Sequence, residues 1–124
     1  MDGYFYIVLN IAEHAYTSEE IVVGKKILQI NLKYKVSASE ISEAFMELAQ
    51  PIADVNGLEW KTWIHNEEEK SAGGIYLFKD EETVKNYLES DIVSGIMSNP
   101  ALSDIDAKVF DVLTEHSKVT RAPI

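Results

Sequence analysis

The sequence predicts an α+β domain in which two helices cover one face of a four-stranded antiparallel sheet. Its order of elements over residues 27–113 is strand, helix, strand, strand, helix, strand. Residues 57–78 form a strand–turn–strand unit that contains both tryptophans and the one Gly-Gly pair. This order of elements is the split βαβ, or ferredoxin-like, arrangement.

The first strand is predicted over residues 27–34, where the side chains alternate between the two faces. Leu28, Ile30, Leu32 and Tyr34 share one face, and the intervening residues are mostly polar. Such a period of two is typical of a half-buried strand.

The first helix begins after Ser37, which is followed three residues later by Glu40 in the spacing of a capping box. The apolar residues that follow recur at helical spacing on one face. Pro51 lacks an N–H group and crowds the preceding turn, so we expect a kink or an early end near residues 49–50.

The central unit consists of a strand over residues 58–65, a polar connection and a second strand over residues 72–78. Alternation along the first of these strands places Trp60 and Trp63 on opposite faces. Gly73 and Gly74 weaken a strand, so they predict a bulge or the close approach of another group.

The second helix is predicted from Asp80, a good N-cap, to about Ser90. Residues 91–98 are expected to form a further helical turn broken at Gly95. The Asn99-Pro100 pair then stops the helix.

The last strand is predicted over residues 105–113. We therefore divide the chain into an N-terminal arm (residues 1–26), the ferredoxin-like domain (residues 27–113) and a polar, frayed tail (residues 114–124).

Charge and composition exclude several functions. The formal net charge of -10 argues against nucleic acids and anionic membranes as partners, because both require clustered basic side chains. The sequence has no cysteine, so disulfides, thiol catalysis and Cys-based metal sites are excluded. The apolar run at residues 4–9 is too short to span a bilayer, and no basic segment precedes it. We expect a cytoplasmic protein.

Two helices cover only one face of such a sheet, yet Trp60 and Trp63 place large side chains on both. An uncovered apolar face predicts a partner, and the simplest partner is a second copy related by two-fold symmetry. We therefore predict a homodimer formed by sheet-to-sheet packing, a dimeric α+β barrel.

Four segments resemble the YdhR-type monooxygenase family. They read GLEWKTWIHN (57–66), AGGIYLFKDEE (72–82), NYLES (86–90) and AKVFDV (107–112), and residues 1–26 lie outside the resemblance. The resemblance implies a dimeric α+β barrel related to small cofactor-free oxygenases of aromatic or quinol-like compounds. In agreement, no flavin, nicotinamide or P-loop motif is present in the sequence.

Three functions stay open at this point. The chain is a cofactor-independent monooxygenase of small aromatic compounds, a binding or sensing module that uses the same pocket without turnover, or an interaction protein. An aromatic-lined cavity with a polar group inside favours the first two.

Six residues are candidates for the site. His65 is a potential base and Tyr76 a potential hydrogen-bond donor to a substrate oxygen, although each also suits a structural role. Those that would bind substrate are Trp60, Trp63, Phe78 and Lys108. No metal site is expected, because His14, His65 and His116 lie in separate segments without ligand spacing.

Overall fold

The structure, a computed structural model, describes residues 24–124. Almost all of the arm that the sequence predicts at residues 1–26 therefore lies outside the described residues.

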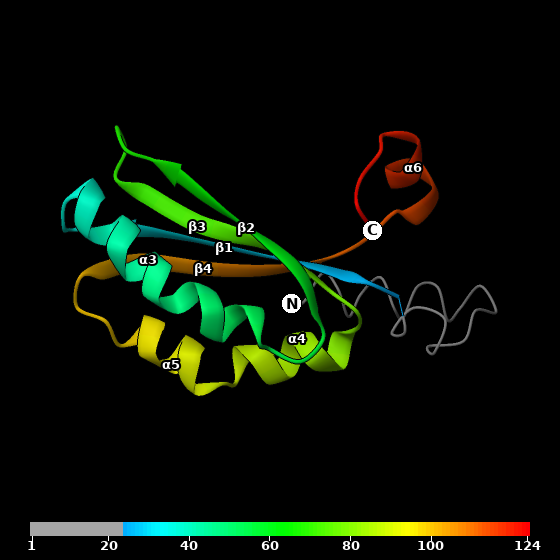
Figure 1. Ribbon diagram of the computed structural model, residues 1–124, viewed down its shortest axis with the longest axis horizontal. Helices are drawn as coiled ribbons and strands as arrows, with labels where there is room; N and C mark the ends of the chain where they lie inside the picture. The colour runs from blue at the N-terminus through cyan, green and yellow to red at the C-terminus, as the bar shows by residue number, and fades with distance from the viewer. Residues whose placement is uncertain (1–23) are drawn as a thin grey trace.

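The described residues form a four-stranded antiparallel sheet with the order β2-β3-β1-β4, which is the ferredoxin-like α+β arrangement (Figure 1). The strands are β1 (Lys26–Tyr34), β2 (Leu58–Asn66), β3 (Ser71–Phe78) and β4 (Leu102–Asp111). The helices are α3 (Ala38–Ala53), α4 (Glu81–Leu88), α5 (Asp91–Met97) and α6 (Thr114–Val119). In Figure 1, α3, α4 and α5 lie on one side of the sheet, whereas α6 stands beyond its other side.

The predicted caps are present. The hydroxyl of Ser37 accepts a hydrogen bond from the backbone N–H of Glu40 at 3.1 Å, which starts α3. The carboxylate of Asp80 accepts one from the N–H of Thr83 at 2.9 Å, which starts α4. Both bonds satisfy donors that the first turn of a helix leaves without a partner.

The predicted early end of the first helix is wrong, because α3 continues through Pro51 to Ala53. Proline removes only one backbone hydrogen bond, and the next turn is kept by the N–H of Asp54, which donates to the carbonyl of Gln50. Ile52 is 1% exposed, so its packing in the core offsets the loss.

Three further boundaries differ from the prediction. Helix α5 runs through Gly95 to Met97 without a break, since Ser90 caps it and the cost of one helical glycine is small. Strand β4 begins at Leu102, three residues early, and the tail contains α6. The tail is also tied down, because the indole N–H of Trp60 donates to the carbonyl of Pro123 at 2.8 Å.

The sheet faces follow the predicted alternation with one exception. A bulge between Leu58 and Trp60 shifts the register against β3, so Leu58 shares the helix face with Trp63 while Trp60 takes the other face. The pairing of β3 with its neighbours shows no register shift at Gly73 or Gly74, so the predicted bulge is absent. The predicted alternative, close approach of another group to these glycines, is present.

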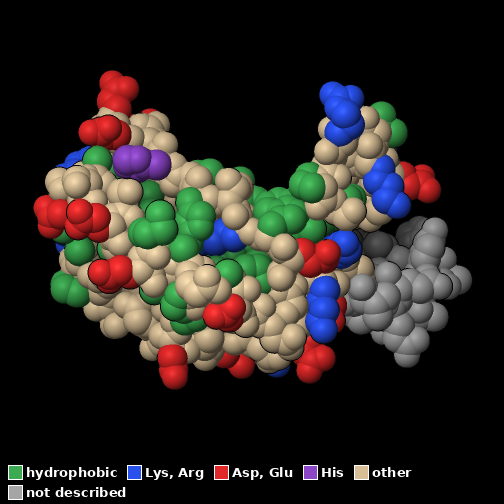
Figure 2. All heavy atoms as spheres, viewed as in Figure 1, with side chains coloured by type: hydrophobic (Ala, Val, Ile, Leu, Met, Phe, Trp, Pro, Cys, Tyr) green, Lys and Arg blue, Asp and Glu red, His purple; other side chains and the backbone are tan. Residues whose placement is uncertain are grey.

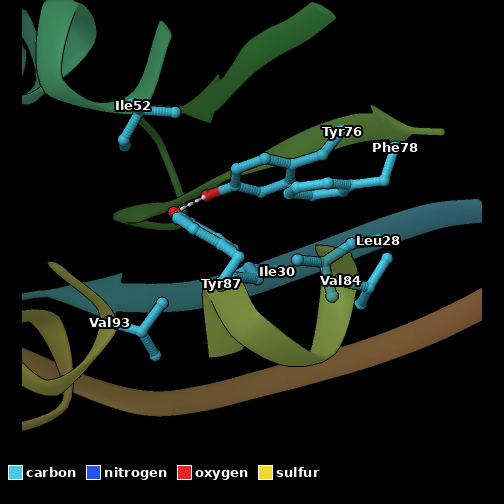
Figure 3. Close-up of a cluster of buried hydrophobic side chains, with 8 residues drawn as sticks. All are labelled: Leu28, Ile30, Ile52, Tyr76, Phe78, Val84, Tyr87 and Val93. Atoms are coloured by element: carbon cyan, nitrogen blue, oxygen red, sulfur yellow. Dashed lines mark hydrogen bonds between the residues drawn. The ribbon is translucent and has the colours of Figure 1, made fainter. Parts of the chain in front are cut away.

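The main core lies between the sheet and α3, α4 and α5 (Figure 3). Tyr76 and Phe78 from β3 stack at 6.0 Å between ring centroids, and Tyr87 from α4 packs against both. Burial of these aromatic rings supplies much of the hydrophobic stabilisation of the domain.

The face away from α3, α4 and α5 is mixed in character. Trp60, Ile64 and Ile75 are half-buried on it, and Phe110 is 46% exposed. Between the ends of the β2–β3 hairpin and α6 the molecular outline is hollowed (Figure 2).

We expect Gly73→Ala to lower the free energy of unfolding by roughly 1–3 kcal/mol, because a Cβ there would lie 1.9 Å from the carbonyl oxygen of Ile30. That contact is with backbone, which can move aside only at a high cost in free energy. Gly95→Ala is the matched control, since nothing lies within 4 Å of its added Cβ. It should stabilise by about 0.5–1 kcal/mol as a helical substitution. Urea denaturation measures both, and equal effects of the two substitutions would contradict the packing argument.

Candidate active site

A cavity of about 550 Å³ lies between the sheet and helices α3 and α5. This volume lies within the range of small-molecule sites. Apolar side chains line most of it: Ile30, Leu32, Phe45, Leu48, Ile92 and Ile96. The charged side chains that line it are Glu40, Glu47, Lys61 and Asp91. The three carboxylates belong to exposed residues of α3 and α5, so they lie where the cavity meets solvent.

Trp63 forms an aromatic wall of this cavity. Its ring packs against Phe45 of α3, with centroids 5.0 Å apart and ring planes at 41°. Strand β2 presents Trp63 to the helices because Trp63 pairs with Gly74, on the same face of the sheet as Tyr76. A planar ligand could stack on this wall.

Lys61 is the basic residue that lines the cavity. Its Nζ lies 3.2 Å from the centroid of the Trp63 ring and 4.4 Å from that of Tyr76. Within residues 24–124 it makes no hydrogen bond or ion pair, so the two ring faces are the groups that contact its amino group. Burial lowers the pKa of Lys61 from 10.5 to about 7.

Gly74 provides the room that Lys61 occupies. A Cβ at Gly74 would lie 2.3 Å from Cε of Lys61 and 3.3 Å from the ring of Tyr76. The missing side chain therefore lets the lysine fold across β3 into the cavity instead of extending to solvent.

Tyr76 closes the inner end of the cavity, but its hydroxyl is already engaged. It lies 2.9 Å from the hydroxyl of Tyr87, and both residues are 1% exposed (Figure 3). Burial raises the pKa of both tyrosines, and the neighbouring Tyr87 adds to the rise at Tyr76. Both phenols therefore stay protonated at neutral pH, and the pair is suited to donating a hydrogen bond rather than to accepting a proton.

His65 lies outside this cavity, at the hairpin end of β2. Its Nε2 is 2.5 Å from the hydroxyl of Tyr34. It lines a smaller hollow of about 290 Å³ between α3 and β2, together with Phe45, Met46 and Ile64. Ile41, Phe45 and Trp63 line both spaces, so they lie between the histidine and the lysine.

The other candidates are dispersed. Trp60 and Lys108 lie on the opposite face of the sheet, where Lys108 is 3.8 Å from Asp106. Phe78 is fully buried behind Tyr76 and does not line the cavity. Of the six predicted residues, the structure thus brings Trp63 and Tyr76 to the cavity.

Sequence reasoning missed Lys61. The signal was present, because alternation along β2 places Lys61 on the same face as Trp63. Its position opposite Tyr76 and beside Gly74 depends on the register of two strands, which the sequence pattern does not specify.

The lowered pKa of Lys61 has a consequence for stability. Between about pH 7 and 10.5 the unfolded chain binds a proton at this residue that the folded chain does not. Stability should therefore rise with pH in this window, by up to about 1.4 kcal/mol per pH unit. We expect Lys61→Met to lose this slope between pH 7 and 9 in urea denaturation. Lys85→Met, at an exposed site on α4, should keep it. Equal slopes in wild type and Lys61→Met would contradict the assignment.

Comparison with known proteins supplies a family. The family model described as "Putative mono-oxygenase ydhR" matches residues 27–123. A search of curated proteins finds no match.

Solved structures share the fold. SnoaB from Streptomyces nogalater, described as a cofactor-independent oxygenase, is 15% identical with a TM-score of 0.61, covering 72% of this chain and 93% of its own. A protein of unknown function from Nitrosomonas europaea is 17% identical with a TM-score of 0.63, covering 73% and 91%. A protein from Caulobacter crescentus, described as a "putative antibiotic biosynthesis monooxygenase", is 19% identical with a TM-score of 0.61, covering 77% and 96%.

The family model matches residues 27–123, which is most of the chain, and these residues include the whole ferredoxin-like domain. The chain therefore belongs to the ydhR mono-oxygenase family.

Proposed function

We propose that the protein is a cofactor-independent monooxygenase that acts on small aromatic or quinol-like compounds in the cavity between the sheet and helices α3 and α5. The observation that carries this proposal is the cavity itself, which joins an aromatic wall at Trp63 to an amino group at Lys61. Membership of a mono-oxygenase family and the fold shared with a cofactor-independent oxygenase support it.

The residues would act by binding and orienting the substrate. A planar ring stacks on Trp63, and an oxygen substituent points toward Lys61. Most of the lining is apolar, and a low local dielectric strengthens electrostatic contacts inside the cavity.

The reaction class balances with oxygen alone. A ring carbon ortho or para to the hydroxyl, which is a CH₂ group in the keto tautomer of the phenol, becomes C=O with one atom of O₂, and the other atom leaves as water with the two hydrogens. The substrate supplies all four electrons, so no external reductant is consumed. An electron-rich substrate anion is required, and the protein has only to bind and stabilise it.

Binding without turnover is the second candidate, since it uses the same cavity. It is favoured by the position of His65, which lies outside the cavity and is bonded to Tyr34. A sensing module would need the walls and the amine but no further group.

We also propose that the chain forms a homodimer through the mixed face of the sheet. Phe110 on this face is 46% exposed. Leu113, at the start of α6, is 66% exposed. Partial exposure of Trp60, Ile64 and Ile75, together with the hollow outline seen in Figure 2, is consistent with a surface that receives a partner.

Among the described residues no helix is long and apolar enough to cross a membrane.

Oxygen uptake with a panel of naphthols and quinols tests turnover. We expect the purified, metal-free protein to consume oxygen with at least one member. No uptake across the panel would refute turnover and favour the binding module.

Trp63→Ala should weaken ligand binding roughly tenfold, because aromatic stacking is worth about 0.5–1.5 kcal/mol beyond area burial. Trp60→Ala is the matched control on the opposite face and should leave affinity unchanged. Equal affinities of wild type and Trp63→Ala would remove Trp63 from the site.

Light scattering at micromolar concentration tests the dimer. We expect twice the mass of the 14.0 kDa chain. Thr62→Arg, an exposed position between Trp60 and Ile64, should yield a folded monomer because it places a charge in the interface. Ser94→Arg on the exposed surface of α5 should leave the dimer intact. A wild-type monomer would refute the proposal.

A further inference from the structure

Lys61 is a half-buried amine that forms no ion pair within the described residues. Tyr76 lies directly opposite it on β3, with its hydroxyl bonded to Tyr87 of α4. The carboxylates that line the cavity are those of Glu40 and Glu47 on α3 and Asp91 on α5. None of them lies within the 4.0 Å of an ion pair with Lys61. Glu40 also accepts a hydrogen bond from the hydroxyl of Ser37 at 3.0 Å.

This arrangement makes the charged state of the amine costly. The ring faces of Trp63 and Tyr76 favour an ammonium ion only modestly, whereas loss of water disfavours it strongly. The pKa of about 7 that results leaves the amine roughly half neutral at neutral pH. An amine tuned to this range is suited to general base catalysis.

We propose that Lys61 is the proton acceptor of the cavity: its amino group removes the proton of a phenolic or enolic hydroxyl and binds the resulting oxyanion as an ion pair. The O–H bond of the ligand breaks, an N–H bond forms on Nζ, and no electrons leave the ligand in this step. The attraction between the ammonium and the oxyanion at close range offsets the roughly thousandfold preference of the proton for the oxyanion in water. This inference rests on the proposed function, because it supplies the electron-rich anion that reaction with oxygen requires.

The proposal defines a ligand class. The ligand enters as a neutral planar ring with one acidic hydroxyl, which fits the apolar walls and the single amine. The carboxylates of Glu40, Glu47 and Asp91 at the solvent side repel ligands that carry further negative charge. A second lysine or arginine to balance a dianion is absent from the residues of 24–124 that line the cavity.

The position of the proton can be measured with 2-naphthol, a phenol whose anion absorbs at longer wavelength than the neutral form. Its hydroxyl has a pKa near that of a tyrosine side chain, about 10, so it is neutral in solution at pH 8. We expect wild-type protein to produce the naphtholate absorption on binding at pH 8. Lys61→Met should bind the neutral form only, and 2-methoxynaphthalene, which has no proton to transfer, should bind the two proteins equally. Naphtholate absorption in Lys61→Met, or neutral naphthol bound to wild type, would overturn the proposal.

Proton exchange with the buffer adds a second readout, obtained by calorimetry in buffers of different ionisation enthalpy. At about pH 6 the wild-type amine already carries its proton, so binding as the anion should release close to one proton. At about pH 8 the proton passes from ligand to amine, and the release should fall close to zero. Lys61→Arg is charged at both pH values and should release one proton at both, whereas Lys61→Met should release none.

These patterns decide the role of Lys61 without relying on turnover. A wild type that behaves like Lys61→Arg carries a permanent charge, and one that behaves like Lys61→Met binds a neutral ligand; either result refutes proton transfer. Lys85→Met, at an exposed position, should match wild type throughout. If naphtholate forms but no oxygen is consumed, the role of Lys61 as proton acceptor is supported and the proposed monooxygenase activity is refuted. If Lys61→Met consumes oxygen at the wild-type rate, the monooxygenase activity is supported and the role of Lys61 as proton acceptor is refuted.

Discussion

The cavity exists because side-chain size changes along one face of β3. The four residues that this strand presents to the helices are Ala72, Gly74, Tyr76 and Phe78. The two aromatic rings fill the space toward α4 and build the main core. At the other end Gly74 carries no side chain, and there the cavity lies between the sheet and helices α3 and α5. One strand thus sets both the solid core and the open site.

The same strand explains why a lysine can lie inside. A side chain at position 74 would occupy the place of the Lys61 stem, so the glycine is what admits the amine to the cavity. The aromatic rings of Trp63 and Tyr76 then border the amine on two sides. Its depressed pKa follows from packing rather than from any charged neighbour. The proposed chemistry therefore depends on the architecture of the hairpin more than on a catalytic motif.

Prediction from the sequence succeeded where the signal was local. The helix caps at Ser37 and Asp80, and the opposite facing of Trp60 and Trp63, were all correctly predicted. The early helix end predicted near Pro51 is wrong because packing of Ile52 offsets the lost hydrogen bond, and the break predicted at Gly95 is wrong because Ser90 caps α5 and one helical glycine costs little.

The sequence by itself determined the order of elements, the two-faced character of the hairpin and the resemblance to the family, because each depends on residues close together in the chain or on a shared pattern. Only the tertiary structure decided which residues form the cavity. It separated His65, Lys108 and Trp60 from the cavity and added Lys61. The physical reason is that strand register, burial and the pKa of an amine arise from groups distant in sequence, and no local pattern encodes them.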